Sequence, residues 1–318
     1  MMMRLITKKT DAFSPFMSVD KIISAQNNFF SNNTLLSEIL IQGDEDLIQS
    51  LVTLIEKYSH LFSNTLGVLP ADIPPFELKV DREKWNNPKN RVPPRIQSPA
   101  KQAETLRQID QLLSQGVIER SNASYYSQVL LTPKPPDGFR FGIDYRKLND
   151  CTESASWPLP NIKQMFVRLG QHKSKVYGVV DLTSGYHQAP LSLSARIFTA
   201  FIAFCGVFHY LRLPFGPKRA PSYFQEVMAA VVLVGLVYFI CEIYLDDCII
   251  HANDNPTFLY RLEQVFQRFD KHKIILKPSK CRFGVSEVEF CGRVISSDGI
   301  SMSGKKISQV LDFPRPIR

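Results

Sequence analysis

Apolar residues recur along the chain in two patterns, which predict helices and strands. Leu47, Leu51, Leu54 and Ile55 keep helical spacing behind Asp44, which predicts a capped helix from Asp44 to Phe62. The same spacing predicts helices over residues 98–115, 161–169, 221–234 and 259–269. Short apolar runs bounded by turn residues predict strands over 127–132, 139–145, 176–180, 198–204, 207–211, 274–276 and 288–290.

Two further stretches of the chain have a different pattern. Residues 1–45 carry little periodicity, so we expect an N-terminal extension there. Prolines recur between residues 69 and 99, which argues against helix and predicts an extended strap. Because helices and strands follow one another without a regular βαβ period, the pattern favours an α+β fold built on an antiparallel sheet.

Two adjacent carboxylates interrupt a hydrophobic part of the chain. Largely apolar residues 243–245 lead into Asp246 and Asp247, and residues 248–250 lead out of them. This pattern predicts two buried strands joined by a tight turn. Two like charges on a hydrophobic hairpin are costly unless a cation neutralises them. Since Asp is a favoured turn residue, a plain hairpin turn without a metal remains an alternative.

Composition and charge limit the classes of protein to which the chain can belong. The chain has 318 residues, of which 44% are hydrophobic and 21% charged, as expected for one large or two medium globular domains. A net charge of +8 favours an anionic partner such as nucleic acid over a merely basic, solvated surface. Seven Lys or Arg against two acids between residues 82 and 107 predict a surface that faces phosphates.

The sequence lacks the signals that identify several other classes of protein. The six cysteines include no C-x-x-C pair, and no His/Cys cluster has zinc spacing. The longest apolar run, residues 227–241, is too short to span a bilayer. Neither G-x-G-x-x-G nor G-x-x-x-x-G-K-[ST] occurs, which disfavours an enzyme with a dinucleotide fingerprint or a P-loop.

A third carboxylate completes a candidate metal site. Asp181 follows the predicted strand 176–180, just as Asp246 and Asp247 follow another apolar run. Three carboxylates that converge from two neighbouring strands make an oxygen-only site, which suits Mg²⁺ or Mn²⁺. Two such ions can hold an attacking hydroxyl and a leaving pyrophosphate in line. The sequence therefore points to nucleotidyl transfer.

Seven sequence blocks occur around these acids in a fixed order. They are 143–149 (IDYRKLN), 157–160 (WPLP), 180–188 (VDLTSGYHQ), 213–216 (LPFG), 220–225 (APSYFQ), 244–247 (YLDD) and 280–283 (KCRF). This set resembles the successive blocks of reverse transcriptases, above all those of gypsy-type LTR retrotransposons. The resemblance extends over about residues 50 to 314.

The resemblance implies a right-hand polymerase fold with fingers, palm and a truncated thumb. It places a lead-in helix and strap at 46–85, the fingers at 86–155 and 189–219, and the palm at 156–188 and 220–297. Residues 298–318 would begin the thumb and connection. We expect the chain to be a fragment of a polyprotein whose RNase H and integrase portions lie outside it.

The resemblance also implies roles for individual residues. Asp181, Asp246 and Asp247 would bind two Mg²⁺ ions, for which Mn²⁺ could substitute, and Lys280 would protonate the leaving pyrophosphate. Tyr186 would lie under the incoming sugar and exclude ribonucleotides; a core aromatic is the alternative. The other implied nucleotide-binding residues are Lys134, Arg140, Phe215, Gly216 and Gln225, and the primer grip would comprise Phe290, Cys291 and Gly292.

The implied function is that of an RNA-directed DNA polymerase for retrotransposon replication, which extends a primer with dNTPs on an RNA or DNA template. Three positions depart from the family pattern. Phe198 stands where a lysine is usual, Pro217 where a leucine is usual, and Cys291-Gly292-Arg293 replaces Leu-Gly-His. These departures leave the metal site whole. They keep open the alternative of an inactive relic or of a co-opted nucleic-acid-binding protein.

Overall fold

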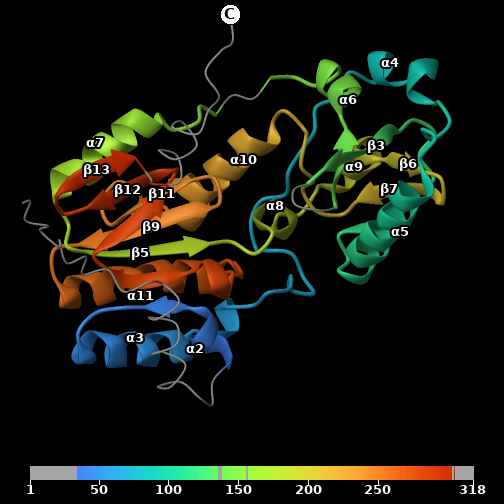
Figure 1. The fold of residues 1–318 in the computed structure, drawn as a ribbon. Helices are drawn as coiled ribbons and strands as arrows, with labels where there is room; N and C mark the ends of the chain where they lie inside the picture. Colours follow the sequence, from blue (N-terminus) through green and yellow to red (C-terminus); the bar gives the residue numbers. More distant parts are fainter. Residues whose placement is uncertain (1–33, 135–137, 155–156, 303, 305–318) are drawn as a thin grey trace, which may run out of the picture.

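Two five-stranded sheets stand side by side in the computed structural model, which describes residues 34–134, 138–154, 157–302 and 304 (Figure 1). The first sheet has the order β1 (Leu40–Ile41), β10 (Arg282–Val285), β5 (Val176–Asp181), β9 (Asp247–Ala252) and β8 (Cys241–Tyr244). Its strands pair antiparallel except β1, which pairs parallel with β10 at the edge. The antiparallel centre agrees with the fold class that the sequence predicts.

Both faces of the first sheet are covered. α11 (Asn255–Lys271) lies against one face, with α3 (Glu45–Lys57) and α2 (Thr34–Glu38) beyond it (Figure 1). α7 (Ile162–His172) and a sheet of β11 (Glu287–Phe290), β12 (Arg293–Ser296) and β13 (Gly299–Met302) cover the other. Consecutive residues of β5 therefore enter two different cores, which explains why this strand is apolar throughout.

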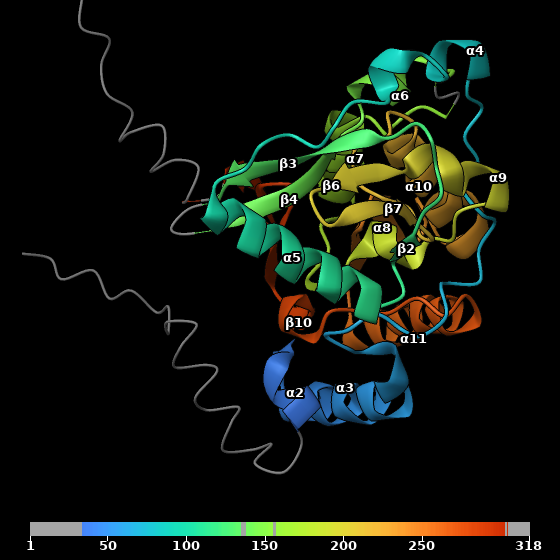
Figure 2. The same cartoon turned by 90° about the vertical axis from the view of Figure 1, so that its right-hand side faces the viewer.

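The second sheet carries a helix of its own. Its order is β2 (Ile118–Arg120), β7 (Gly206–Tyr210), β6 (Phe201–Ala203), β3 (Ser127–Pro133) and β4 (Phe139–Asp144). α5 (Pro99–Ser114) lies across one side of this sheet (Figure 2). The short helix α8 (Gly185–Gln188) and α10 (Ala220–Val227) lie between the two sheets (Figure 1).

Short helical segments complete the described chain. They are η1 (Ser59–Leu61), α4 (Arg82–Trp85), η2 (Pro88–Asn90), α6 (Arg146–Asp150), α9 (Leu193–Arg196), η3 (Ile197–Thr199), η4 (Met228–Val232) and η5 (Pro278–Lys280). No helix in the described part of the chain is long and apolar enough to cross a membrane.

Most of the predicted elements are present, and their local signals operate as expected. The carboxylate of Asp44 accepts a hydrogen bond from the Leu47 amide at 2.8 Å and so caps α3. α5 begins at Pro99 and ends just before Gly116, as its sequence predicts. Between the predicted strands 127–132 and 139–145 the sequence Pro135-Pro136-Asp137-Gly138 predicts a turn, of which residues 135–137 lie outside the described part of the chain.

Four expectations about secondary structure are wrong. The strand expected over residues 274–276 does not form, because Pro278 begins η5 and Leu276 makes only isolated bridges. The proline-rich strap contains a helical turn, α4, because residues 76–87 are free of proline and Asp81 caps it. Part of the expected N-terminal extension belongs to the fold, since β1 is the edge strand of the first sheet and α2 contacts η5. The helix expected over residues 221–234 is regular only to Val227 and continues as the π-helix η4.

Candidate active site

The centre of the first sheet brings the predicted acids together. Asp181 is the last residue of β5 and Asp247 the first of β9, and the two are direct partners across the antiparallel ladder. Asp246 lies in the turn that joins β8 to β9. The structure therefore places Asp181, from the block 180–188, beside Asp246 and Asp247, from the block 244–247, as the sequence predicts.

The turn that carries Asp246 has an unusual backbone. Leu245 adopts a left-handed conformation with φ of 58°, which costs a non-glycine residue about 1 kcal/mol. Close packing surrounds this turn as well. A Cβ atom on Gly185 of α8 would lie 3.2 Å from Cβ of Asp246, so glycine permits the close approach of α8.

Gln225 of α10 supports the same turn. Its side-chain oxygen accepts from the Leu245 amide at 2.7 Å, and its side-chain nitrogen donates to the Ile243 carbonyl at 3.2 Å. The residue is only 1% exposed. Both ends of its amide bind backbone, so Gln225 braces this turn, and its part in nucleotide binding stays a prediction.

The three acids form a cluster of negative charge. Burial, together with the charges of Asp246 and Asp181, raises the pKa of Asp247 to about 6. Burial likewise raises the pKa of Asp246, with a contribution from the charge of Asp181. Repulsion between partly buried carboxylates is relieved by a cation in their midst. The donor set therefore suits a divalent ion with a preference for oxygen ligands.

Lys280 of η5 lies beside this cluster. Its Nζ atom is 2.8 Å from Oδ2 of Asp181. Burial lowers the pKa of Lys280, but the hydrogen bond to Asp181 and the charges of the other two acids outweigh burial and raise it. Among the residues that the structure describes, no three His, Cys, Asp or Glu side chains are already arranged as a metal-binding group. The acids thus face a lysine ammonium in this structure.

An aromatic pair adjoins the acids. The rings of Tyr186 on α8 and Phe215 stack at a centroid distance of 4.8 Å and an angle of 15°. Tyr186 is 8% exposed, whereas Phe215 is 61% exposed, so the pair offers one open side to a ligand. Burial, with a contribution from the nearby charge of Asp246, raises the pKa of Tyr186 to about 12.

Asn149, a residue that the sequence analysis did not single out, holds the loop after Phe215. Its side-chain nitrogen donates to the Gly216 carbonyl at 3.0 Å, and its oxygen accepts from the Lys218 amide at 2.7 Å. Gly216 has φ of 111°, and a Cβ atom there would approach the Tyr145 ring to 3.0 Å. Asn149 ends the block 143–149, but no local pattern signals these bonds, since their partners lie 67 and 69 residues further along the chain.

The remaining predicted residues lie on two separate hairpins. Arg140 is exposed on β4 opposite Thr132, and the amide of the exposed Lys134 donates to the Gly138 carbonyl at 3.0 Å. Cys291 and Gly292, both with positive φ, form the two-residue turn between β11 and β12. Phe290 is 1% exposed in the core, so its backbone and the turn are what this hairpin can present.

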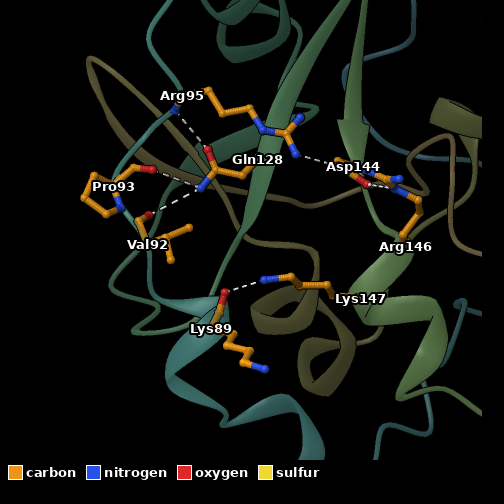
Figure 3. Close-up of polar contacts among 8 residues, drawn as sticks. All are labelled: Lys89, Val92, Pro93, Arg95, Gln128, Asp144, Arg146 and Lys147. Carbon is orange, nitrogen blue, oxygen red and sulfur yellow. Dashed lines mark hydrogen bonds and ion pairs between the residues drawn. The ribbon is translucent and has the colours of Figure 1, made fainter.

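A basic cavity of about 400 Å³ opens beside the second sheet (Figure 3). Asp144 at its wall accepts hydrogen bonds from Arg146 at 2.7 Å and from Arg95 at 2.8 Å. The bond from Arg146, and after it that from Arg95, holds the pKa of Asp144 well below its usual range. Lys147 donates to the carbonyl of Lys89 across the cavity. The cluster of cations between residues 82 and 107 is the sequence signal for this surface.

Comparison with known proteins identifies the class. The model of the family described as "Reverse transcriptase (RNA-dependent DNA polymerase)" matches residues 132–295, about half of the chain. This match includes all three acids, Tyr186 and Lys280. The chain belongs to the reverse transcriptase family.

Its curated relatives are retrotransposon polyproteins. The Pol polyprotein of transposon 297 from Drosophila melanogaster is 34% identical over 68% of this chain and 20% of the polyprotein. That of transposon 412 from the same organism is 29% identical over 98% of this chain and 25% of the polyprotein. The Tf2-3 polyprotein of Schizosaccharomyces pombe is 28% identical over 76% and 18%, respectively. The chain thus spans about a quarter or less of these relatives.

Solved structures share the fold. A foamy viral protease–reverse transcriptase in complex with double-stranded DNA superimposes with a TM-score of 0.74 at 21% identity, over 98% of this chain and 52% of that one. The same protein in complex with an RNA/DNA hybrid gives a TM-score of 0.71 at 19% identity, over 98% and 40%. The predicted right-hand polymerase fold is therefore confirmed.

Proposed function

We propose that this chain is the polymerase part of an RNA-directed DNA polymerase, which adds deoxynucleotides to the 3′ end of a primer for retrotransposon replication. The observation that carries the proposal is the pairing of Asp181 with Asp247 across β5 and β9, with Asp246 beside them. These carboxylates would hold two Mg²⁺ ions, which supply charge stabilisation for an in-line phosphoryl transfer. The first sheet then belongs to the palm and the second to the fingers.

The residues around the acids bind and orient the substrates. Tyr186, stacked on Phe215 and close to Asp246, lies under the deoxyribose and leaves no room for a 2′-hydroxyl. Arg140 and Lys134 on the β3–β4 hairpin grip the triphosphate, for which a guanidinium offers paired donors. Lys280 donates a proton to the leaving pyrophosphate oxygen.

The template and primer bind along both sheets. The solved neighbours hold double-stranded DNA and an RNA/DNA hybrid, which supports a duplex as the partner of this fold. The basic cavity at Arg95 and Arg146 has the charge to bind template phosphates (Figure 3). The turn at Cys291 and Gly292 presents backbone groups to the primer end.

Primer extension on an RNA template in Mg²⁺ tests this proposal. Asp246→Asn keeps the size of the side chain but removes its charge, so we expect the extension rate to fall at least about a hundredfold. Asp298→Asn makes the same change at an exposed position on the β12–β13 turn and should leave the rate unchanged. Extension by the Asp246→Asn variant at the rate of the unchanged protein would contradict the proposal.

The alternative of an inactive relic is separated by a binding measurement on the same proteins. Both hypotheses predict that the chain binds a primer–template and that binding weakens as salt rises. Only the polymerase also incorporates nucleotides in a metal-dependent manner. Tight, salt-sensitive binding without incorporation would favour the relic.

A further inference from the structure

We propose that Lys280 is a built-in counter-cation, which occupies the carboxylate of Asp181 while the site lacks metal and is displaced when a divalent ion binds. The inference rests on the metal site of the proposed function and adds a competitor to it. Its first support is direct contact, since Nζ of Lys280 lies 2.8 Å from Oδ2 of Asp181. The Asp181 side chain is 13% exposed and that of Lys280 is 55% exposed, so the ammonium can swing away into solvent.

The segment that carries Lys280 is fastened to the acidic strand end. The Lys277 amide donates to the Asp181 carbonyl at 2.9 Å, and the Thr183 amide donates to the Ile275 carbonyl at 3.0 Å. These bonds hold residues 275–277 against the end of β5. The fold therefore fixes the backbone that leads to Lys280, while the exposed end of its side chain can leave Asp181.

Gln188 strengthens this attachment from α8. Its side-chain nitrogen donates to the carbonyls of Thr183 at 2.9 Å and Ile275 at 2.7 Å, and its oxygen accepts from the Ile275 amide at 2.7 Å. Gln188 is 3% exposed, so these three bonds are shielded from water. The helix that carries Tyr186 and the segment that leads to Lys280 are thus hydrogen-bonded to each other beside the end of β5.

The charge balance of the cluster makes Lys280 and a metal ion competitors. Its ammonium lies 2.8 Å from a carboxylate oxygen of Asp181, which is itself the direct ladder partner of Asp247. A divalent cation among the same carboxylates would repel the ammonium and take over the oxygen that it holds. Metal binding therefore includes the cost of breaking the Lys280–Asp181 ion pair.

Titration with Mn²⁺, followed by the EPR signal of the free ion, measures this competition without relying on catalysis. We expect Lys280→Ala to bind Mn²⁺ about two- to fivefold more tightly than the unchanged protein, the range for a half-exposed ion pair. Lys280→Arg keeps the charge and should bind as the unchanged protein does. Lys277→Ala removes a positive charge three residues away and serves as the matched control, with an affinity within about twofold of the unchanged protein.

Thermal unfolding gives a second readout. Without metal, Lys280→Ala leaves the acids without their counter-cation, so its Tm should fall below that of the unchanged protein, and Mn²⁺ should raise the Tm of the variant more. Lys280→Met, which keeps the length of the side chain, replaces the alanine variant should that one fail to fold.

Two outcomes would overturn the inference. If the unchanged protein binds Mn²⁺ and Lys280→Ala binds it no more tightly, or Lys277→Ala tightens it equally, Lys280 is no specific competitor and the proposed function stands. If no protein in the series binds Mn²⁺ saturably, the metal site itself is absent. The proposed function then fails together with the inference.

Discussion

At the scale of single residues, the candidate site combines side chains that we propose to contact ligand with side chains that hold backbone. The three acids, Tyr186 and Lys280 belong to the first kind. Gln225, Gln188 and Asn149 are buried or partly buried, and each binds backbone groups of a neighbouring segment. The first kind is visible in the sequence because a charge at the end of an apolar run is conspicuous. The second kind is not, because its partners are distant along the chain.

Tyr186 carries the prediction that belongs at this scale. If its ring excludes the 2′-hydroxyl, Tyr186→Ala should raise ribonucleotide incorporation relative to deoxyribonucleotide by about ten- to a hundredfold, since a steric pocket discriminates in that range. Single-nucleotide incorporation with matched ribo- and deoxyribonucleotides measures the ratio. Tyr260→Ala, at an exposed position of α11, is the control. An unchanged ratio in Tyr186→Ala would remove the residue from this role.

At the scale of elements, α10 fixes the geometry of the turn between β8 and β9. The left-handed Leu245 is held by a single buried side chain, that of Gln225, which pairs the polar backbone groups on either side of Tyr244. A strained turn with such a brace keeps Asp246 in place before any ligand arrives.

Removing the brace should therefore cost stability. Gln225→Ala leaves the Leu245 amide and the Ile243 carbonyl without this partner, and we expect the free energy of unfolding to fall by about 1–3 kcal/mol. Urea denaturation measures the change. Gln164→Ala, on the exposed side of α7, removes the same side chain without buried partners and should cost far less. Equal losses in the two variants would show that Gln225 does not brace the turn.

Individual elements also show which parts of the fold can be predicted from sequence patterns and which cannot. α3, α5 and β5 have regular spacing and clear boundary residues, and the sequence predicts them. β10 escapes detection because its pairing shifts between Phe283 and Val285, where Gly284 has φ of 74°. A Cβ atom on Gly284 would lie 2.0 Å from the Gln42 carbonyl oxygen, so the pairing of β10 with β1 requires glycine there. The same glycine interrupts the apolar pattern from which β10 could have been predicted.

At the scale of the whole molecule, the two sheets bring together segments that are remote in sequence. β10 comes late in the chain yet pairs with both β1 and β5, an order that no local pattern encodes. The resemblance of the ordered blocks supplied what periodicity could not, namely that Asp181 and the Asp246–Asp247 pair share one site. The division into palm and fingers and the individual residue roles remain predictions.

The proposed polymerase function depends most on the meeting of Asp181, Asp246 and Asp247 at one metal site. Anomalous difference density from crystals of the chain soaked in Mn²⁺ tests this directly. We expect a peak within coordination distance, about 2–2.5 Å, of oxygens from Asp181, Asp246 and Asp247, with Lys280 turned away from Asp181. Saturating Mn²⁺ that leaves no peak between β5 and the β8–β9 turn, with Lys280 still on Asp181, would contradict the account.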